Sequence, residues 1–127
     1  MFTPELRLEH ADARGEIYSL TLPGDQEALL LHSVAGSLRG GHAHTVDEVV
    51  LMLTGKMEYH KRGLDGKESI DTVKGGQGSF NKAGVPHLGI FQEDSWLLEW
   101  KLNTQKGGWR NIDDETWRKQ VVANSAG

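Results

Sequence analysis

The chain contains no cysteine, and this absence restricts both its covalent chemistry and its metal chemistry. Neither disulfides nor thiolate metal sites can form, so any metal ion must be held by imidazole and carboxylate groups. No apolar run has the length of a membrane span, and the first twenty residues carry several charged side chains instead of the apolar core of a signal peptide. We therefore expect a cytoplasmic protein with no membrane contact.

An excess of positive charge is also missing. The 14 lysines and arginines are outnumbered by 18 aspartates and glutamates, so the net charge is -4 at pH 7. Proteins that bind nucleic acid carry a basic stripe, which this sequence lacks, and we expect no nucleic-acid partner. With 127 residues, 37% of them hydrophobic, the chain can build one core but not two. We expect a single domain over residues 1–127.

Short segments typical of β-strands make up most of the sequence. They are residues 16–22, 27–34, 49–53, 56–62, 67–74, 79–81, 87–92 and 96–101. Turn signals such as Pro23-Gly24-Asp25 separate them at intervals of roughly eight to twelve residues, the spacing of an all-β sandwich or barrel. Strands of a parallel βαβ protein would alternate with helical segments instead. The pattern predicts an all-β fold.

One helix is predicted near the C-terminus, over about residues 114–122, with residues 123–127 frayed. Asp113 is a suitable N-cap, and Ile112 and Trp117 have the spacing of a hydrophobic staple. We expect the helix to cover one face of a sheet with Trp117 and Val121.

The segment from Gly36 to Gly55 contains the residues that point to chemistry. Successive side chains of an extended chain point to opposite faces, so His42 and His44 share one face at a separation of roughly 7 Å. Imidazoles at this spacing can close onto one ion. Glu48 joins them if the strand is regular or bends only gently. A helix would direct the two histidines to nearly opposite sides, and Gly40-Gly41 disfavours a helix here.

A second segment supplies another histidine. Pro86 biases Val85 towards an extended conformation, so the backbone enters His87 as a strand, and Gly84 provides a tight turn just before. His87 is then the natural fourth ligand, contributed by a separate strand. Three imidazoles and one carboxylate suit a divalent transition metal ion, namely iron, manganese, nickel, cobalt, copper or zinc. With such an ion the site keeps a positive charge, which favours an anionic oxygen ligand.

These two segments resemble the two sequence motifs of the cupin superfamily. The first motif, which holds a His-x-His pair and a glutamate between two glycines, is matched throughout by Gly36, His42, His44, Glu48 and Gly55. The second motif is matched by Gly76, Gly84 and His87, with Lys82 at the usual proline and Phe91 at the usual asparagine. The resemblance implies a jelly-roll barrel, the cupin double-stranded β-helix, with the site inside its mouth.

The first functional hypothesis is a small metalloenzyme that acts on an oxygen-rich small molecule. Four protein ligands leave room on the metal for substrate. Iron would support dioxygenase chemistry, whereas manganese, nickel or zinc would act as a Lewis acid for isomerisation or decarboxylation. A general base would then come from the cavity wall, and Tyr59 and Glu99 are the candidates.

Two other hypotheses stay open. The run from Arg39 to His44 also resembles the nucleotide-sugar 3,4-ketoisomerase branch of the cupins, which works without a metal. On that hypothesis His44 is the proton shuttle and Arg39 helps to hold the substrate; otherwise Arg39 is a solvated loop arginine. The remaining hypothesis is a non-catalytic cupin domain that binds a small ligand.

A homodimer is expected from the apolar run Val49 to Leu53. Its apolar residues point to both faces of the strand, so something must cover the outer face. In cupins a second subunit often does this.

Two further expectations concern tryptophans. Trp96 and Trp100 share one face, which is typical of core residues. We assign Trp109, in a glycine-flanked loop, to a subunit contact.

Overall fold

The computed structural model describes residues 1–126. Within this part of the chain, strands precede a single C-terminal helix, and no helix is long and apolar enough to cross a membrane. The strands are β1 (Glu5–Asp12), β2 (Gly15–Leu22), β3 (Gln26–Ser33), β4 (Leu38–His44), β5 (Glu48–Thr54), β6 (Lys56–Arg62), β7 (Glu68–Lys74), β8 (Gly78–Asn81), β9 (His87–Phe91), β10 (Ser95–Lys101) and β11 (Asn111–Asp113). The helix is α1 (Glu115–Ala126). The predicted all-β fold with a C-terminal helix is confirmed.

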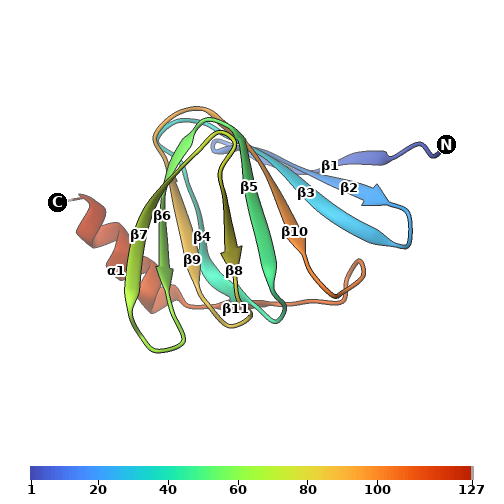
Figure 1. The fold of residues 1–127 in the computed structure, drawn as a ribbon. Coiled ribbons are helices and arrows are strands. Elements are labelled where there is room, and N and C mark those ends of the chain that lie inside the picture. The colour runs from blue at the N-terminus through green and yellow to red at the C-terminus, as the bar shows by residue number, and fades with distance from the viewer. Residues whose placement is uncertain (127) are drawn as a thin grey trace.

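Two antiparallel sheets form the body of the molecule (Figure 1). The six-stranded sheet has the order β1-β2-β3-β10-β5-β8, and the five-stranded sheet has the order β11-β4-β9-β6-β7. Neighbours such as β3 and β10, or β4 and β9, are far apart in the sequence. Each sheet therefore needs both halves of the chain, and the site that lies between the sheets is assembled from distant segments.

The core fills the space between the sheets because alternate side chains of each strand point inward. On β5, Val50 and Met52 are buried while Leu51 and Leu53 are exposed on the outer face. The main apolar cluster combines residues of both sheets, namely Leu31, Val50, Met52, Met57, Tyr59, Val73, Phe91 and Leu97.

The N-terminal hairpin of β1 and β2 extends away from the barrel (Figure 1). Every residue of β1 is exposed, and β1 pairs only with β2. The sequence analysis missed β1 and β11. The alternation typical of a strand was present in β1, where Leu6 and Leu8 alternate with Glu5, Arg7 and Glu9, although both leucines are exposed. Strand β11 has only three residues, too few to show a pattern.

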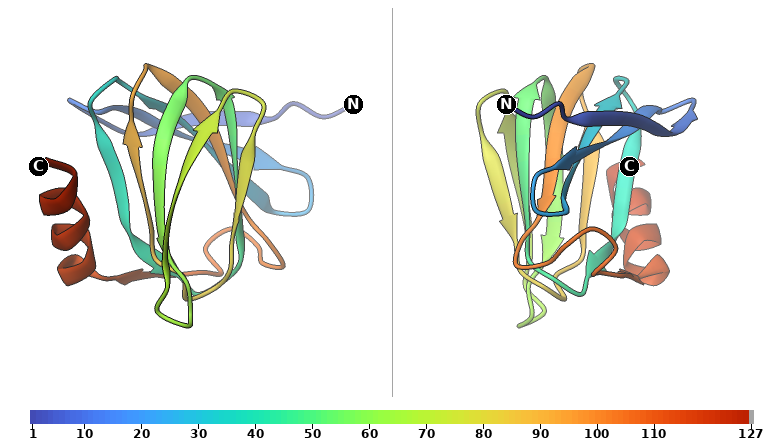
Figure 2. Two further views of the ribbon diagram at one scale, coloured as in Figure 1. Left: turned by 60° about the vertical axis from the view of Figure 1, so that its left-hand side comes forward. Right: turned by 90° about the vertical axis from the view of Figure 1, so that its right-hand side faces the viewer.

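Helix α1 lies along the outside of the five-stranded sheet, on the flank away from the β1–β2 hairpin (Figure 2). Its Trp117 and Val121 pack on Leu88 of β9, as predicted. The N-cap is Asp114 and not Asp113, because the Trp117 amide donates to Asp114 Oδ1 at 3.2 Å. Asp113 instead pairs within the sheet.

The helix also continues further than predicted. Residues 123–126, which we expected to be frayed, belong to α1, and residue 127 lies outside the described part of the chain.

The Trp117 Nε1 group donates to Glu68 Oε1 at 2.6 Å, so the buried indole has a polar partner as well as apolar contacts.

Trp117→Ala should lower the free energy of unfolding by about 3–5 kcal/mol, because Trp117 is only 1% exposed and its loss leaves a cavity beneath α1. Val122→Ala is the matched control in the same helix, since Val122 is 41% exposed, and its effect should stay within about 0.5 kcal/mol. Urea unfolding followed by circular dichroism measures both. Equal effects of the two substitutions would contradict this packing.

Candidate metal centre

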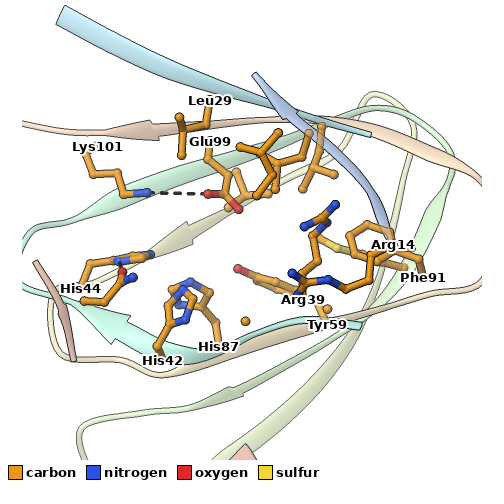
Figure 3. Close-up of a pocket in the computed structure, with 18 of the residues that line it drawn as sticks. Arg14, Leu29, Arg39, His42, His44, Tyr59, His87, Phe91, Glu99 and Lys101 are labelled. Atoms are coloured by element: carbon orange, nitrogen blue, oxygen red, sulfur yellow. Dashed lines mark hydrogen bonds and ion pairs between the residues drawn. The ribbon is translucent and has the colours of Figure 1, made fainter. Parts of the chain in front are cut away.

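Three histidines from two neighbouring strands meet inside the barrel. His42 and His44 lie on β4, His87 begins β9, and the pairing of these strands places His42 directly opposite His87. One ring nitrogen of each histidine lies within 4.8 Å of those of the other two. Figure 3 shows the three rings together on one side of a cavity. The structure thus brings these three residues together, and their function as metal ligands stays a prediction.

Two glycines allow this register. Gly40 and Gly41 have φ angles of 104° and 93°, and the pairing of β4 with β9 shifts between Gly40 and His42, as in a β-bulge. A Cβ atom on Gly40 would lie 2.6 Å from the carbonyl oxygen of His87. Only glycine combines this conformation with such a close approach, so the glycine pair sets where His42 faces His87.

Hydrogen bonds orient two of the rings. His44 Nδ1 lies 2.8 Å from Asn111 Oδ1, and His87 Nδ1 lies 3.2 Å from the carbonyl oxygen of Val85. A carbonyl oxygen only accepts, so each Nδ1 carries the proton and each Nε2 directs its lone pair elsewhere. Metal-binding histidines are commonly held in this way, with one ring nitrogen donating to a protein oxygen and the other left for the ion.

Burial keeps the imidazoles in the form that binds a cation. It lowers the pKa of His87 to about 4, against the opposing charge of Glu48. It also lowers the pKa of His42, with the charge of His44 acting in the same direction. A metal ligand must be unprotonated. His42 and His87 therefore meet this requirement at neutral pH.

Glu48 reaches the same centre from the opposite sheet. We expected one gently bent strand to carry His42, His44 and Glu48, and this was wrong: β4 ends at His44, the chain crosses over, and β5 begins with Glu48 in the six-stranded sheet. Glu48 Oε2 still lies 3.1 Å from His44 Nε2, and Glu48 Oε1 lies 3.4 Å from His87 Nε2.

One buried atom at this contact, His44 Nε2, lacks a hydrogen-bond partner among the described residues, and Glu48 Oε2 beside it has only the ammonium group of Lys101, at 2.7 Å. With the proton of His44 on Nδ1, both are acceptors, and they face each other across 3.1 Å. Buried acceptors normally have a donor or a cation. The residues present therefore fit a metal ion.

A buried lysine that the sequence analysis did not identify lies beside Glu48. Lys101 is 6% exposed, its Nζ lies 2.7 Å from Glu48 Oε2 and 3.6 Å from Glu99 Oε2, and it sits 4.0 Å from the centre of the Trp109 ring. Strand register explains the first contact, because Lys101 pairs directly with Glu48 between β10 and β5. The sequence did contain a signal for this burial. Lys101 lies two residues after Glu99 and four after Leu97, so all three side chains share the inward face of β10.

Lys101 helps to keep Glu48 ionised. Burial acts to raise the pKa of Glu48, but the positive charge of Lys101 acts in the opposite direction and favours the ionised carboxylate. On the other side, Asn81 Nδ2 donates to Glu48 Oε1 at 3.1 Å. Glu48 is thus a fully buried carboxylate held between Asn81 and Lys101, and an incoming metal ion would compete with Lys101 for it.

Trp109 and Asn111 complete the surroundings of His44. The Trp109 ring is nearly perpendicular to that of His44, with ring centres 5.2 Å apart. Asn111 lies opposite His44 in the pairing of β11 with β4. The Trp109 ring therefore lies against the site, and the subunit contact assigned to this residue stays a prediction. No local sequence pattern indicated these contacts with His44, since they depend on the pairing of β11 with β4, two strands that are distant in the sequence.

A cavity of about 260 Å³ adjoins the histidines. In Figure 3, the histidines line one side, Arg14 and Arg39 line the other, and Glu99 and Lys101 lie along a third. Arg39 is only 8% exposed, so the alternative of a solvated loop arginine is wrong. Apolar residues line the space between these groups, namely Ile17, Leu29, Leu31, Val50, Met57, Phe91 and Leu97.

The two candidate proton-transfer residues also line this cavity. Tyr59 is 4% exposed, its hydroxyl accepts a hydrogen bond of 2.7 Å from Asn81 Nδ2, and burial raises its pKa well above the usual value. Burial and the charge of Glu48 raise the pKa of Glu99. A carboxyl group whose pKa moves towards neutrality is better suited to exchange protons than a buried phenol, so the geometry favours Glu99 over Tyr59.

Comparison of the sequence with family models and with curated proteins finds no match. Solved structures do match. The capsular polysaccharide assembling protein CapF from Staphylococcus aureus is 18% identical over 87% of this chain and 35% of that chain, with a TM-score of 0.67. W96F oxalate decarboxylase from Bacillus subtilis is 19% identical over 98% of this chain and 35% of that chain, with a TM-score of 0.65.

KdgF from Halomonas sp. is 14% identical over 72% of this chain and 81% of that chain, with a TM-score of 0.59. The chain thus spans about a third of the length of CapF and of oxalate decarboxylase but most of the length of KdgF. This chain has two antiparallel sheets, and His42, His44 and His87 from its two histidine motifs border the cavity. The protein therefore has the cupin fold.

Proposed function

We propose that the protein is a small metalloenzyme that holds a divalent transition metal ion with His42, His44 and His87 and acts on an oxygen-rich small molecule. One observation carries the proposal: three imidazole nitrogens within 4.8 Å of one another border a cavity of about 260 Å³. Glu48 is the proposed fourth ligand, and Lys101 governs how free its carboxylate is to bind.

The donor set suits iron, manganese, nickel, cobalt, copper or zinc. When bound, the ion supplies Lewis acidity or, in the case of iron, dioxygen chemistry. The chain itself orients the rings of His44 and His87 through Asn111 and the Val85 carbonyl, and apolar side chains line much of the cavity. Oxalate decarboxylase, which shares the fold, is named for a small oxygen-rich substrate, and this supports the proposed class of substrate.

Glu99 is the proposed proton-transfer residue. Its carboxyl group lies on the cavity wall, and Glu99 Oε2 is 3.6 Å from Lys101 Nζ. A proton taken from a bound substrate can be held on this carboxyl group because burial raises its pKa. Tyr59 stays protonated and can donate its hydroxyl hydrogen to a substrate oxygen while it accepts from Asn81.

We further propose a homodimer that buries the outer face of the six-stranded sheet. The exposed apolar side chains there are Leu51 and Leu53 of β5, Phe80 of β8, and Trp96 and Trp100 of β10. Strand pairing makes them neighbours, since Trp100 lies beside Val49 and Val49 beside Phe80. The two tryptophans were expected in the core and point outward instead. A contiguous apolar patch of this kind marks an interaction surface.

A cytoplasmic location and the lack of a nucleic-acid partner stay predictions from the sequence. Fractionation of cells that produce the full chain, and gel-shift assays with DNA and RNA, address them directly.

His44→Ala should reduce the bound metal to no more than about a tenth of the wild-type content, because it removes a ligand that Asn111 holds in place. Elemental analysis of protein purified without an affinity tag gives the metal and its amount. His10→Ala is the matched control, since His10 is an exposed histidine on β1, and it should retain the metal.

Activity is measured in the same preparations with a panel of small oxygen-rich acids and sugars. Metal lost together with activity in His44→Ala supports the metalloenzyme. Metal lost with activity retained would refute it. Activity in a metal-free wild type that His44→Ala abolishes would instead favour the metal-independent isomerase hypothesis, in which His44 is the proton shuttle. A metal-loaded wild type that binds ligands without turnover would identify a binding domain.

Lys101→Met should tighten metal binding by at least about tenfold. The substitution leaves Glu48 buried without its counter-ion, which costs about 3–5 kcal/mol in the metal-free protein, and a bound cation recovers part of that cost. Calorimetric titration with Zn²⁺ or Mn²⁺ measures the affinity, and thermal unfolding should show a lower melting temperature only without metal. Lys106→Met, which removes an exposed ion pair with Glu27, is the control. Unchanged or weaker metal binding in Lys101→Met would show that Lys101 does not compete for Glu48.

The double variant Leu51→Glu with Trp100→Glu should be monomeric, because it introduces like charges into the proposed interface. Size-exclusion chromatography with light scattering measures the mass. Ile70→Glu is the control, since Ile70 is 62% exposed on β7 of the other sheet, and it should stay dimeric. A monomeric wild type would remove the dimer proposal.

A further inference from the structure

We propose that Arg39, with Arg14 beside it, binds the carboxylate of a monoanionic substrate at the end of the cavity opposite the histidines. The inference rests on the proposed function, because it assigns the substrate class of the same cavity. It would make the ligand a small carboxylic acid that spans from the arginines to the metal centre.

Arg39 is a buried cation whose hydrogen-bond partners among the described residues are neutral. Its Nε donates to Ser33 Oγ at 2.6 Å and its Nη2 donates to the His32 carbonyl oxygen at 3.1 Å. The arginine ion pairs in the described residues belong to Arg7, Arg14 and Arg62. Burying a charge without a counter-ion is costly, so an anion at Arg39 would satisfy a need that the fold leaves open.

The remaining hydrogen-bond capacity of Arg39 suits a planar acid. Its two contacts fix the orientation of the guanidinium and use Nε and one hydrogen of Nη2. The edge formed by Nη1 and Nη2 stays free to donate two parallel hydrogen bonds. This fork matches the two oxygens of a carboxylate.

Charge balance at this end selects a single negative charge. Arg14 also lines the cavity, but its Nε and Nη2 bind Asp12, with Nη2 at 2.7 Å from Asp12 Oδ2. Asp12 therefore neutralises Arg14. Among the described residues, Arg39 is then the arginine of this cavity without an ion-pair partner, and its single charge favours a carboxylate over a doubly charged phosphate.

The apolar part of the cavity lining favours an apolar body in the ligand. Leu29, Leu31 and Phe91 are among the apolar residues that line the same cavity as the arginines and the histidines. At about 260 Å³ the cavity is slightly smaller than pockets for drug-sized ligands, which begin at about 300 Å³. The ligand class is thus a small monocarboxylic acid with an apolar body and an oxygen function at its far end.

The test compares 3-phenylpropanoate with 3-phenylpropanamide, which differ in charge and hardly in shape. Calorimetric titration of the Mn²⁺-loaded full chain should show that the acid binds at least about tenfold more tightly than the amide. Arg39→Gln should abolish this preference, and Arg39→Lys, which keeps the charge without the fork, should retain part of it. Arg7→Gln removes an exposed arginine on β1 and should behave as the wild type.

Circular dichroism and the melting temperature without ligand establish that each variant is folded. If Arg39→Gln does not fold, Arg39→Lys and the comparison of acid with amide on the wild type decide. Equal binding of acid and amide, no binding of the acid with a dissociation constant below about 1 mM, or an unchanged preference in a folded Arg39→Gln variant overturns the inference.

Metal content measured on the same samples separates this inference from the proposed function. A preference for the acid in a protein that holds no metal refutes the metalloenzyme and keeps the anion site. A full metal content without any preference for the acid refutes the anion site alone.

Discussion

The register between β4 and β9 is the constraint on which the candidate site depends. It places His42 opposite His87 and leaves His44 close to both, and the conformations of Gly40 and Gly41 make the necessary shift in pairing possible. A side chain at either glycine would strain the backbone. The histidine cluster therefore depends on two residues that carry no chemistry of their own.

The second sheet supplies the charges. Glu48 and Lys101 face each other as paired residues of β5 and β10, and Asn81 holds Glu48 from β8. The histidines thus belong to one sheet and their charged neighbours to the other, so any change in the spacing of the sheets alters the electrostatics of the centre. At the far end of the cavity, Arg39 provides a positive charge without an ion pair among the described residues, and apolar side chains make up much of the remaining lining.

Most of the fold follows from local patterns. Strand β5 was predicted because an unbroken apolar run there has the length of a strand, and helix α1 was predicted because a capping residue precedes an apolar stripe. Strand β1 was missed although Leu6 and Leu8 alternate with charged residues, and both leucines are exposed. Trp96 and Trp100 were expected in the core, because alternation shows which residues share a face but not which face turns inward.

The sequence by itself determined that His42 and His44 point to the same side, since the period of an extended chain is a local property, and the two motifs indicated that His87 would join them. Only the tertiary structure decided that Glu48 approaches from the opposite sheet, that Lys101 and Trp109 stand beside it, and that Arg39 is buried. The physical reason is that these contacts arise from the register between strands that are distant in the sequence. Register reflects the packing of the whole barrel, and no short segment encodes it.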